Sequence, residues 1–288
     1  MRKLIILDFD GTLTNAEEEG SKYRIGYLED IALLADLPLE TVVSWATEFE
    51  AHILANPSDF GWNFQGKIVA PASVDPYLRV MPIARMILDR AQVYTNLVER
   101  DRLLDRILYK YNYQKTEDSF REGAAAFFHN LSTIPNSTVC VVSNSHTEPI
   151  QKKIGRLASN SGYDFQWLIS NVTGSARKYL LSDNHDILPE SMSVPGLSRP
   201  MYLRRHLYHQ TICSLQEKFQ SDWEHTTVIG DIFELDLSVP LFCGAHVGLM
   251  TNTFTPQYEK DFLHQHPKGS THASLHDAYL WLKNLSYM

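Results

Sequence analysis

The sequence predicts an α/β protein with a doubly wound parallel sheet and an inserted, mostly α-helical domain. Three short apolar runs rich in β-branched residues, at 3–7, 138–142 and 226–229, each end abruptly at Asp, Ser or Gly. Continuous runs of this kind are typical of strands buried on both faces by helices. More than a hundred residues separate the first run from the second, far more than one crossover helix requires. The intervening segment is therefore expected to form a domain of its own.

The sequence patterns that predict further elements of the sheet domain are weaker. Apolar runs at 166–169 and 245–249 are expected to be strands, and residues 120–131 are expected to be a helix before the second strand. Ligands of open α/β sheets bind beyond the carboxyl ends of the strands. The polar residues that end the apolar runs are therefore candidates for one shared site.

The inserted segment has a helical pattern. Helices are expected over 27–37, 39–54, 76–94 and 97–111 from the spacing of their apolar residues. Residues 56–76 contain several prolines and glycines and are expected to be a long loop. For the same reason residues 182–200 are expected to be a second, smaller excursion.

Composition excludes several classes of protein. The 288 residues carry 26 Lys and Arg against 34 Asp and Glu, a net charge of −8, whereas a nucleic-acid binder normally presents a basic face. No apolar run reaches the length of a membrane span or of a signal-peptide core. Three dispersed cysteines without a C-x-x-C pair indicate neither disulfides nor zinc. We expect a cytoplasmic protein with no nucleic-acid or membrane partner; the sequence does not indicate its oligomeric state.

Two aspartates follow the first apolar run. Because side chains alternate along an extended chain, the carboxylates of Asp8 and Asp10 emerge on the same side and repel each other unless a cation lies between them. Mg²⁺ binds one or two carboxylates together with water and phosphate oxygens, and Gly11 permits a sharp turn beside a ligand. The pattern predicts a Mg²⁺ site that also binds a phosphate group.

Polar residues also follow the later strands. Ser143 and Asn144 end the second strand, where a hydroxyl and free backbone N–H groups can bind a phosphate oxygen. Lys178 follows a glycine turn. Asp231 comes directly after a strand and a glycine and is expected to bind the metal, whereas Asp236 is expected to orient a lysine.

Together these residues resemble the haloacid dehalogenase superfamily of aspartate-dependent hydrolases. The resemblance rests on D-x-D-G-T at 8–12, a strand-terminal Ser143, Lys178, and G-D-x-x-x-x-D at 230–236, in the family's order. It implies a Rossmann-like catalytic core of residues 1–14 and 120–288 with a helical cap at 15–119. Lys152 and Lys153 are rivals for the motif lysine, although a solvated helix suits their position better.

The resemblance also implies a mechanism. Asp8 would attack phosphorus to give an aspartyl-phosphate, and Asp10 would protonate the leaving oxygen and then accept a proton from water. Mg²⁺ would be held by Asp8, the backbone carbonyl of Asp10 and Asp231, while Asp236 would hold the motif lysine. The substrate-binding set implied is Thr12, Ser143, Asn144 and Lys178.

Asp10 and Asp231 favour a phosphatase acting on a small phosphorylated substrate over a dehalogenase, because cleavage of a carbon–halogen bond needs neither a second acid nor a metal. Two relatives in the same superfamily remain alternatives: a phosphonatase, for which Lys67 would form a Schiff base, and a phosphomutase. Loop residues Phe60, Trp62 and Phe64, with Lys67, are candidates for substrate specificity.

A different class is suggested by the spacing G-x-x-x-x-G-K at 61–67, which matches a phosphate-binding P-loop. Ile68 stands where that motif has Ser or Thr, and no strand precedes it, so we treat the match as coincidence. A non-catalytic nucleotide- or phosphate-binding scaffold is the remaining alternative. His206 and His209 lack a third metal ligand nearby, and a solvated basic helix face is expected there.

Overall fold

A computed structural model describes residues 2–112, 119–183 and 187–285, excepting the side chains of 108–112. The chain divides into two compact units. The core unit comprises Met1–Asn15 and Phe120–Met288, and the helical unit comprises Ala16–Ser119. In the described part of the chain, no helix combines the length and the apolar composition that crossing a bilayer would require.

The core unit contains the predicted parallel sheet. Its six strands run in the order β10-β9-β8-β1-β4-β5, and every neighbouring pair is parallel. Their bounds are β1 Lys3–Leu7, β4 Ser137–Val142, β5 Val172–Thr173, β8 Thr226–Gly230, β9 His246–Met250 and β10 Gly269–His272. The first strand of the chain lies in the middle of the sheet, where Ile5 is in register with Val139 on one side and Thr227 on the other.

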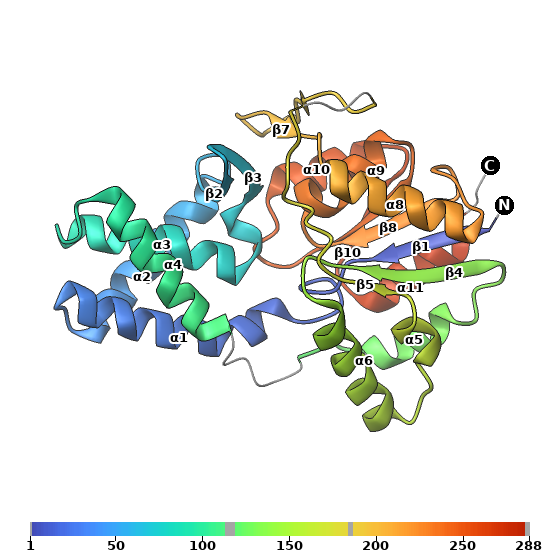
Figure 1. Cartoon of the computed structure of the whole chain (residues 1–288), viewed down its shortest axis with the longest axis horizontal. Helices are drawn as coiled ribbons and strands as arrows, with labels where there is room; N and C mark the ends of the chain where they lie inside the picture. Colours follow the sequence, from blue (N-terminus) through green and yellow to red (C-terminus); the bar gives the residue numbers. More distant parts are fainter. Residues whose placement is uncertain (1, 113–118, 184–186, 286–288) are drawn as a thin grey trace. The chain divides into compact units, whose positions relative to one another are not determined.

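Helices cover both faces of this sheet (Figure 1). Leu4 and Ile6 of β1 pack in one apolar core with α8 (His206–Phe219), α9 (Ser238–Phe242) and α10 (Gln257–Gln265). Ile5 and Leu7 point to the other face and pack with α5 (Ala124–Leu131), α6 (Thr147–Ser161) and α11 (Leu275–Asn284). Burial on both faces explains why β1 is a continuous apolar run. The predicted doubly wound α/β fold is confirmed.

Within its described residues, the helical unit contains α1 (Ala16–Ala35), α2 (Leu39–Ala55), α3 (Pro76–Arg90) and α4 (Leu97–Asn112). Its core includes the fully buried Tyr27, Ile31 and Ile87. Helix α1 begins much earlier than predicted, because its first turn carries three glutamates that interact favourably with the free N–H groups of a helix start. Helix α3 ends earlier than predicted, since Gln92 and Tyr94 adopt left-handed backbone conformations.

The segment 56–76 is not the long loop that we predicted. It forms a hairpin of β2 (Gly61–Phe64) and β3 (Lys67–Pro71), followed by a short helix, η1 (Ala72–Val74). Gln65 and Gly66 both have positive φ, 51° and 77°, as a two-residue hairpin turn requires. The P-loop spacing at 61–67 therefore lies on a hairpin, with no helix directly after it to bind phosphate.

Two predictions for the core unit are also corrected. Residues 166–169 form a helix, α7 (Gln166–Ile169), rather than a strand, and the Asp164 carboxylate accepts the N–H of Gln166 at its start. Helix α5 begins at Ala124 rather than at residue 120, because Phe120 forms a β-bridge with Thr14.

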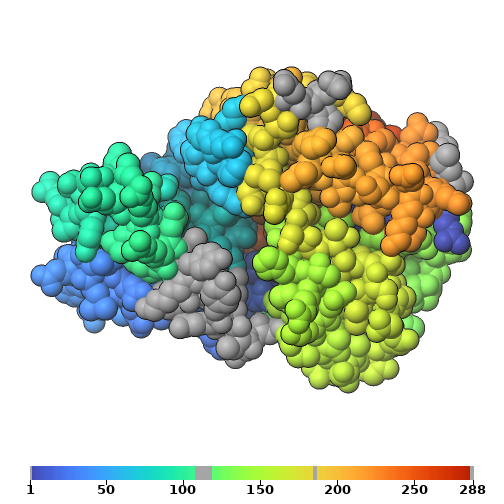
Figure 2. Space-filling model, in the orientation of Figure 1, coloured from blue at the N-terminus to red at the C-terminus, as the bar shows by residue number. Residues whose placement is uncertain are grey.

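The second excursion packs onto the core unit. Its strands β6 (Ser191–Met192) and β7 (Met201–Tyr202) form an antiparallel pair, while residues 184–186 lie outside the described part. Leu188, Val194 and Leu197 are buried in the same core as α8, and Figure 2 shows this yellow segment beside the orange helix. We define residues 187–205 as the strap.

The expected solvated basic face at the start of α8 is only partly present, because His206 is exposed but Arg205 and His209 are not. Arg205 is fully buried, and His209 is 7% exposed. The ring of His209 stacks on Trp223, with 5.5 Å between ring centroids. Stacking on Trp223 thus covers the ring of His209, whereas His206 remains exposed.

The buried His272 at the end of β10 predicts a pH dependence of stability. Burial lowers its pKa to about 4, against a slight opposite effect of Asp277, and no described residue forms a hydrogen bond with its Nε2. The neutral ring is favoured in the folded state, so the contribution of His272 is present above pH 6.5 and lost as pH falls towards 4. We expect a loss of about 3 kcal/mol over this window.

Urea unfolding at pH 7 and pH 4.5 would test this prediction. His272→Leu should flatten the pH dependence, whereas His276→Leu, at an exposed position of α11, should keep it. An unchanged pH slope in His272→Leu would contradict the assignment.

Candidate active site

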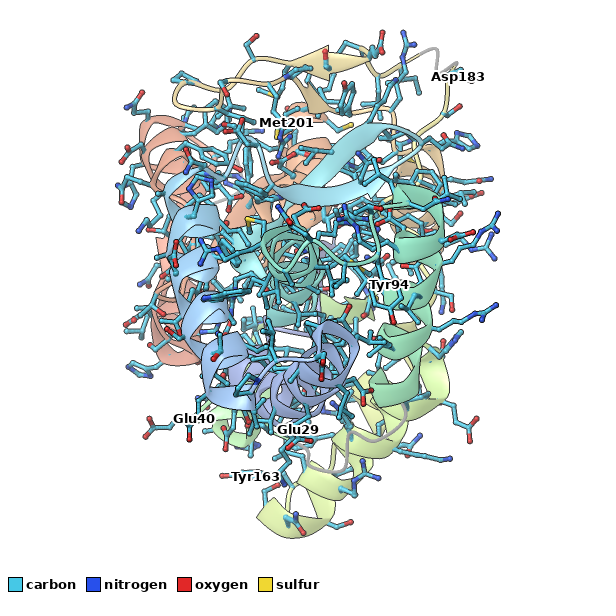
Figure 3. The ribbon with its side chains drawn as sticks, turned by 90° about the vertical axis from the view of Figure 1, so that its left-hand side faces the viewer. Glu29, Glu40, Tyr94, Tyr163, Asp183 and Met201 are labelled. Carbon is cyan, nitrogen blue, oxygen red and sulfur yellow. The ribbon has the colours of Figure 1, made fainter. Side chains whose placement is uncertain are left out.

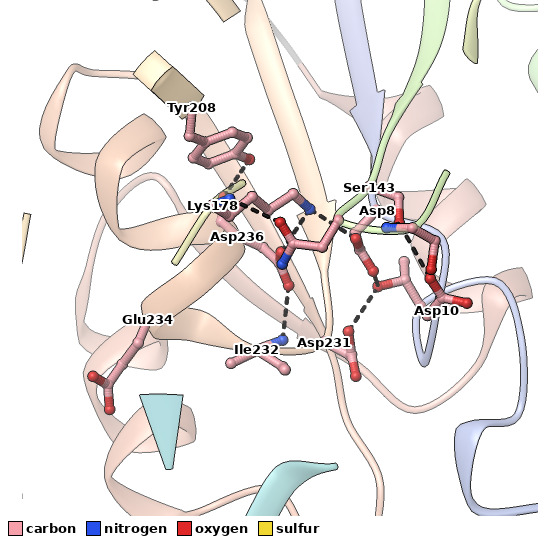
Figure 4. A network of polar contacts seen from close by, with 12 residues as sticks. Asp8, Asp10, Ser143, Lys178, Tyr208, Asp231, Ile232, Glu234 and Asp236 are labelled. Atoms are coloured by element: carbon pink, nitrogen blue, oxygen red, sulfur yellow. Dashed lines mark hydrogen bonds and ion pairs between the residues drawn. The ribbon is translucent and has the colours of Figure 1, made fainter. Parts of the chain in front are cut away.

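The candidate site lies at the carboxyl edge of four adjacent strands (Figure 4). Asp8 follows β1, Ser143 follows β4, Asp231 follows β8, and Lys178 lies in the segment after β5. These strands are neighbours in the order β8-β1-β4-β5. Because all of them are parallel, residues more than two hundred positions apart in the sequence meet at one edge.

Lys178 is the charge at the centre of this site. Its Nζ lies 2.7 Å from Asp8 Oδ1 and 2.8 Å from Asp236 Oδ1, and the side chain is 1% exposed. The rival lysines lie elsewhere: Lys152 is exposed and pairs with Glu148, and the ammonium of Lys153 lies over the ring of Phe9. Of these three lysines, only Lys178 bridges the two buried carboxylates.

Thr12 joins Asp8 to Asp231. Its fully buried hydroxyl lies 3.0 Å from Asp8 Oδ2 and 3.1 Å from Asp231 Oδ1. We expected this side chain to bind substrate, but its hydroxyl is engaged between two carboxylates. Oxygens of Asp8, Asp231 and Asp236 all lie within 4.8 Å of one another. Such a buried set of carboxylate oxygens suits a hard divalent cation.

Ser143 lies against the second aspartate of the first motif. Its hydroxyl donates to Asp10 Oδ2 at 3.1 Å and accepts the N–H of Ser145 at 3.0 Å. The neighbouring Asn144 uses its side-chain oxygen to accept the N–H of Lys178 at 2.8 Å. Asn144, which we expected to contact substrate, therefore fixes the backbone that carries the lysine.

Two glycines allow these loops to approach one another. Gly11 has φ of +83°, and a Cβ built there would lie 2.1 Å from Asp231 Oδ2. A Cβ on Gly230 would lie 2.4 Å from the Cβ of Asp236. A Cβ at Gly11 would therefore push the first and last motifs apart, and the positive φ of this residue also favours glycine. A Cβ at Gly230 would displace Asp236 within the last motif.

The site has more negative than positive charge. Burial raises the pKa of Asp8 to about 7, although the ammonium of Lys178 acts in the opposite direction. Burial also disfavours the charged form of Lys178, but the carboxylates of Asp236 and Asp8 raise its pKa well above the usual value. One ammonium therefore faces the carboxylates of Asp8 and Asp236, with Asp10 and Asp231 beside them, and a bound cation would relieve the excess.

Comparison with known proteins yields matches of structure only. No family model and no curated protein matches the sequence. The structure is similar to the putative HAD-hydrolase YfnB from Bacillus subtilis, with a TM-score of 0.51 and 13% identity over 99% of each chain. It is also similar to a haloacid dehalogenase-like protein from Agrobacterium tumefaciens, with a TM-score of 0.50 and 13% identity over 98% of each chain. A third match is the haloacid dehalogenase-like hydrolase SP0104 from Streptococcus pneumoniae, with a TM-score of 0.50 and 12% identity over 98% of each chain.

The chain has the haloacid dehalogenase-like fold. The resemblance inferred from the motifs is thus confirmed at the level of the fold. The positions that carry those motifs, Asp8, Ser143, Lys178 and Asp231, are the ones that the sheet brings together. Asp236 is engaged by Lys178 and also accepts the N–H of Ile232 at 3.0 Å.

Within this haloacid dehalogenase-like fold, two residues of α8 and the strap support the lysine and were missed in the sequence. Arg205 donates to the backbone carbonyl of Lys178 at 2.8 Å. The hydroxyl of Tyr208 donates to the backbone carbonyl of Asp236 at 2.8 Å, and its ring centroid lies 5.3 Å from the Lys178 ammonium. No sequence pattern marks these contacts, because they depend on where the strap places α8.

A second buried network holds the turn between Asp231 and Asp236. The side chain of Glu234 is fully buried and accepts two hydrogen bonds from Arg199 of the strap, at 2.9 and 2.6 Å. Tyr258 of α10 donates to the same carboxylate at 3.0 Å. The strap therefore contacts both the lysine segment and the turn of the last motif.

Removing the Tyr208 hydroxyl should measure how much its hydrogen bond to the backbone carbonyl of Asp236 stabilises the fold. Tyr208→Phe keeps the ring but leaves the buried carbonyl of Asp236 without that donor, so we expect a loss of about 1–3 kcal/mol in the free energy of unfolding. Urea unfolding would check it, with Tyr163→Phe at an exposed position as the control. Equal stabilities of Tyr208→Phe and the unmodified chain would contradict the assigned role of the hydroxyl.

Proposed function

We propose that this chain is a Mg²⁺-dependent phosphomonoester hydrolase that acts on a small phosphorylated molecule, with Asp8 as the nucleophile. The observation that carries the proposal is the buried Asp8 carboxylate, fixed on one oxygen by Lys178 and on the other by Thr12. A carboxylate held in one orientation at a strand end is suited to in-line attack on phosphorus. The fold of haloacid dehalogenase-like hydrolases supports a hydrolytic reaction.

The reaction divides into two displacements at phosphorus. An oxygen of Asp8 forms a bond to phosphorus while the ester P–O bond breaks, and Asp10 gives its proton to the leaving alcohol oxygen. Asp10 then accepts a proton from water as that water attacks phosphorus, which releases inorganic phosphate and regenerates the Asp8 carboxylate. Before substrate binds, the hydrogen bond from Ser143 orients the carboxyl group of Asp10.

Charge on the phosphoryl group is met by the side chains around Asp8. The Lys178 ammonium, kept protonated by Asp236, would stabilise the phosphoryl oxygens together with the hydroxyl of Ser143. Asp8, the backbone carbonyl of Asp10 and Asp231 are the proposed Mg²⁺ ligands, because Asp236 is occupied by Lys178 and Ile232. When bound, the cation would supply positive charge to the phosphoryl group. The Bacillus subtilis structure with the same fold is bound to magnesium, which supports this choice of metal.

A reducing, cytoplasmic environment suits the cysteines of this protein. Cys140, Cys213 and Cys243 are free thiols. Burial raises the pKa of Cys140 and of Cys243 to about 12, so both remain in the unreactive thiol form. We include cytoplasmic location in the proposal because the three cysteines are unpaired, as is usual in a reducing compartment.

Release of inorganic phosphate from a panel of phosphomonoesters and phosphonates, with Mg²⁺ or with a chelator, tests the activity. Asp8→Asn and Lys178→Ala should each lower kcat by at least about three orders of magnitude. Lys152→Ala, which removes an exposed lysine, should retain activity. Unimpaired turnover by Asp8→Asn would refute the covalent mechanism, and release from phosphonates alone would favour a phosphonatase.

Metal binding can be tested without any substrate. Mg²⁺ should raise the melting temperature of the full chain, because a ligand that binds only the folded state stabilises it by mass action. Asp231→Asn should abolish the increase, whereas Asp261→Asn, at an exposed position of α10, should keep it. The same increase in Asp231→Asn as in the unmodified chain would remove Asp231 from the metal site.

A further inference from the structure

The guanidinium of Arg121 joins the turn of the first motif to the end of β9. Its Nε donates to the backbone carbonyl of Gly11 at 2.9 Å, and its Nη1 donates to that of Thr251, directly after β9, at 3.3 Å. The backbone N–H of Arg121 donates to the carbonyl of Leu13 at 2.9 Å. The main chain and the side chain of Arg121 are therefore both bound to the segment that carries the first motif.

The contacts of Arg121 are suited to fixing backbone rather than to neutralising a carboxylate. Among the described residues, its side chain donates to the two carbonyl oxygens and forms an ion pair with no carboxylate. Burial lowers the pKa of Arg121, although the charge of the nearby Asp231 acts in the opposite direction. Because burial of a charge without an ion pair is unfavourable, the position of this guanidinium is best explained by the backbone that it holds.

The backbone in question surrounds Gly11, which has no side chain to restrict the rotation of the peptide groups on either side of it. The peptide group before Gly11 contains the carbonyl of Asp10, a proposed Mg²⁺ ligand, and the one after it contains the carbonyl of Gly11. Each group has its own anchor. Arg121 binds the Gly11 carbonyl, and Thr14 Oγ1 accepts the N–H of Gly11 at 3.1 Å.

These two anchors determine where the carbonyl oxygen of Asp10 points. The peptide group is planar and trans, so this oxygen points away from the N–H that the fully buried Thr14 accepts. No described residue donates a hydrogen bond to it. The same turn lies against a second proposed ligand, since a Cβ on Gly11 would be 2.1 Å from Asp231 Oδ2. The chain thus orients the Asp10 carbonyl without using its lone pairs.

We propose that Arg121 and Thr14 are positioning residues that hold the carbonyl oxygen of Asp10 in the orientation in which it binds Mg²⁺. They act through Gly11, whose two peptide groups they fix. This inference rests on the proposed function, which requires Mg²⁺ at Asp10 and Asp231. A turn that is ordered before the cation arrives need not lose conformational freedom when the cation binds.

Isothermal titration calorimetry of the full chain with Mg²⁺, in the absence of substrate, tests the role of Arg121. Arg121→Met should weaken Mg²⁺ binding about tenfold or more, as is usual when a residue that orients a metal ligand is lost. Loss of a positive charge near Asp231 would by itself strengthen the binding of a cation, so weaker binding reports the lost orientation. Tighter or unchanged binding in Arg121→Met would overturn this role.

Thr14→Val tests the other anchor without any change of charge. Valine keeps the shape of threonine but cannot accept the N–H of Gly11, so Mg²⁺ binding should again weaken about tenfold or more. Thr14→Ser keeps the hydroxyl and should retain the affinity of the unmodified chain. Equal affinities of Thr14→Val and Thr14→Ser would overturn the role of Thr14.

Controls separate positioning from stability. Arg102→Met removes an exposed guanidinium of α4, and Asp183→Asn removes an exposed carboxylate of the core unit (Figure 3). Both should leave Mg²⁺ binding unchanged. Urea unfolding without Mg²⁺ gives the stability of each variant. A lower free energy of unfolding in Arg121→Met and Thr14→Val, with unchanged Mg²⁺ affinity of the folded chain, would show a merely structural role and overturn the proposal.

The outcomes distinguish this inference from the proposed function. Phosphate release by the unmodified chain, together with unchanged Mg²⁺ affinity in Arg121→Met and Thr14→Val, would overturn the inference alone. Weaker Mg²⁺ binding in both variants, with no phosphate release from any substrate, would refute the proposed function alone. Absence of Mg²⁺ binding to the unmodified chain would overturn both.

Discussion

The buried ammonium of Lys178 between Asp8 and Asp236 is the interaction on which the rest of the core depends. Two carboxylates this close and this buried would repel each other strongly without a cation between them. The lysine cannot move far, because Asn144 and Arg205 hold its backbone on two sides. The orientation of the Asp8 side chain therefore depends on Lys178 and, through the backbone of that lysine, on Asn144 and Arg205.

The strap gives these segments a common support. Arg199 holds the turn that carries Asp236, and Arg205 holds the segment that carries Lys178. A buried charge without a partner destabilises the fold far more than a paired one. Loss of the Arg199 guanidinium would leave the carboxylate of Glu234 without its ion pair. Loss of the Arg205 guanidinium would leave the backbone carbonyl of Lys178 without this donor. What resembles an irregular excursion in the sequence is a structural part of the site.

The sequence predicted the fold correctly where a pattern has a single physical explanation. Asp8, Ser143 and Asp231 could be placed at strand ends because each follows a continuous apolar run rich in β-branched residues, and the structure has β1, β4 and β8 there. The prediction failed where the signal was local and ambiguous. Residues 166–169 are too few to distinguish a strand from a helix by apolar pattern, and the polar strand β10 carries no apolar signal. The hairpin turn at Gln65 and Gly66 had a recognisable glycine, but the surrounding prolines favoured a loop. Arg205 and Tyr208 could not be found at all, because their partners are backbone carbonyls brought near by tertiary packing.

The position of β1 in the sheet has a consequence for how the chain folds during synthesis. This strand precedes both of its neighbours in the chain, and Ile5 pairs with Val139 and Thr227, so β1 has no neighbour until β4 has been made. The helical unit is a compact body of residues 16–119 and can fold during that delay, since domains generally fold as units in the order of their synthesis. The insertion thus lengthens the time during which the apolar strand β1 waits for partners distant in sequence. The convergence of Asp8 and Asp231 therefore requires the chain as far as β8 (Thr226–Gly230).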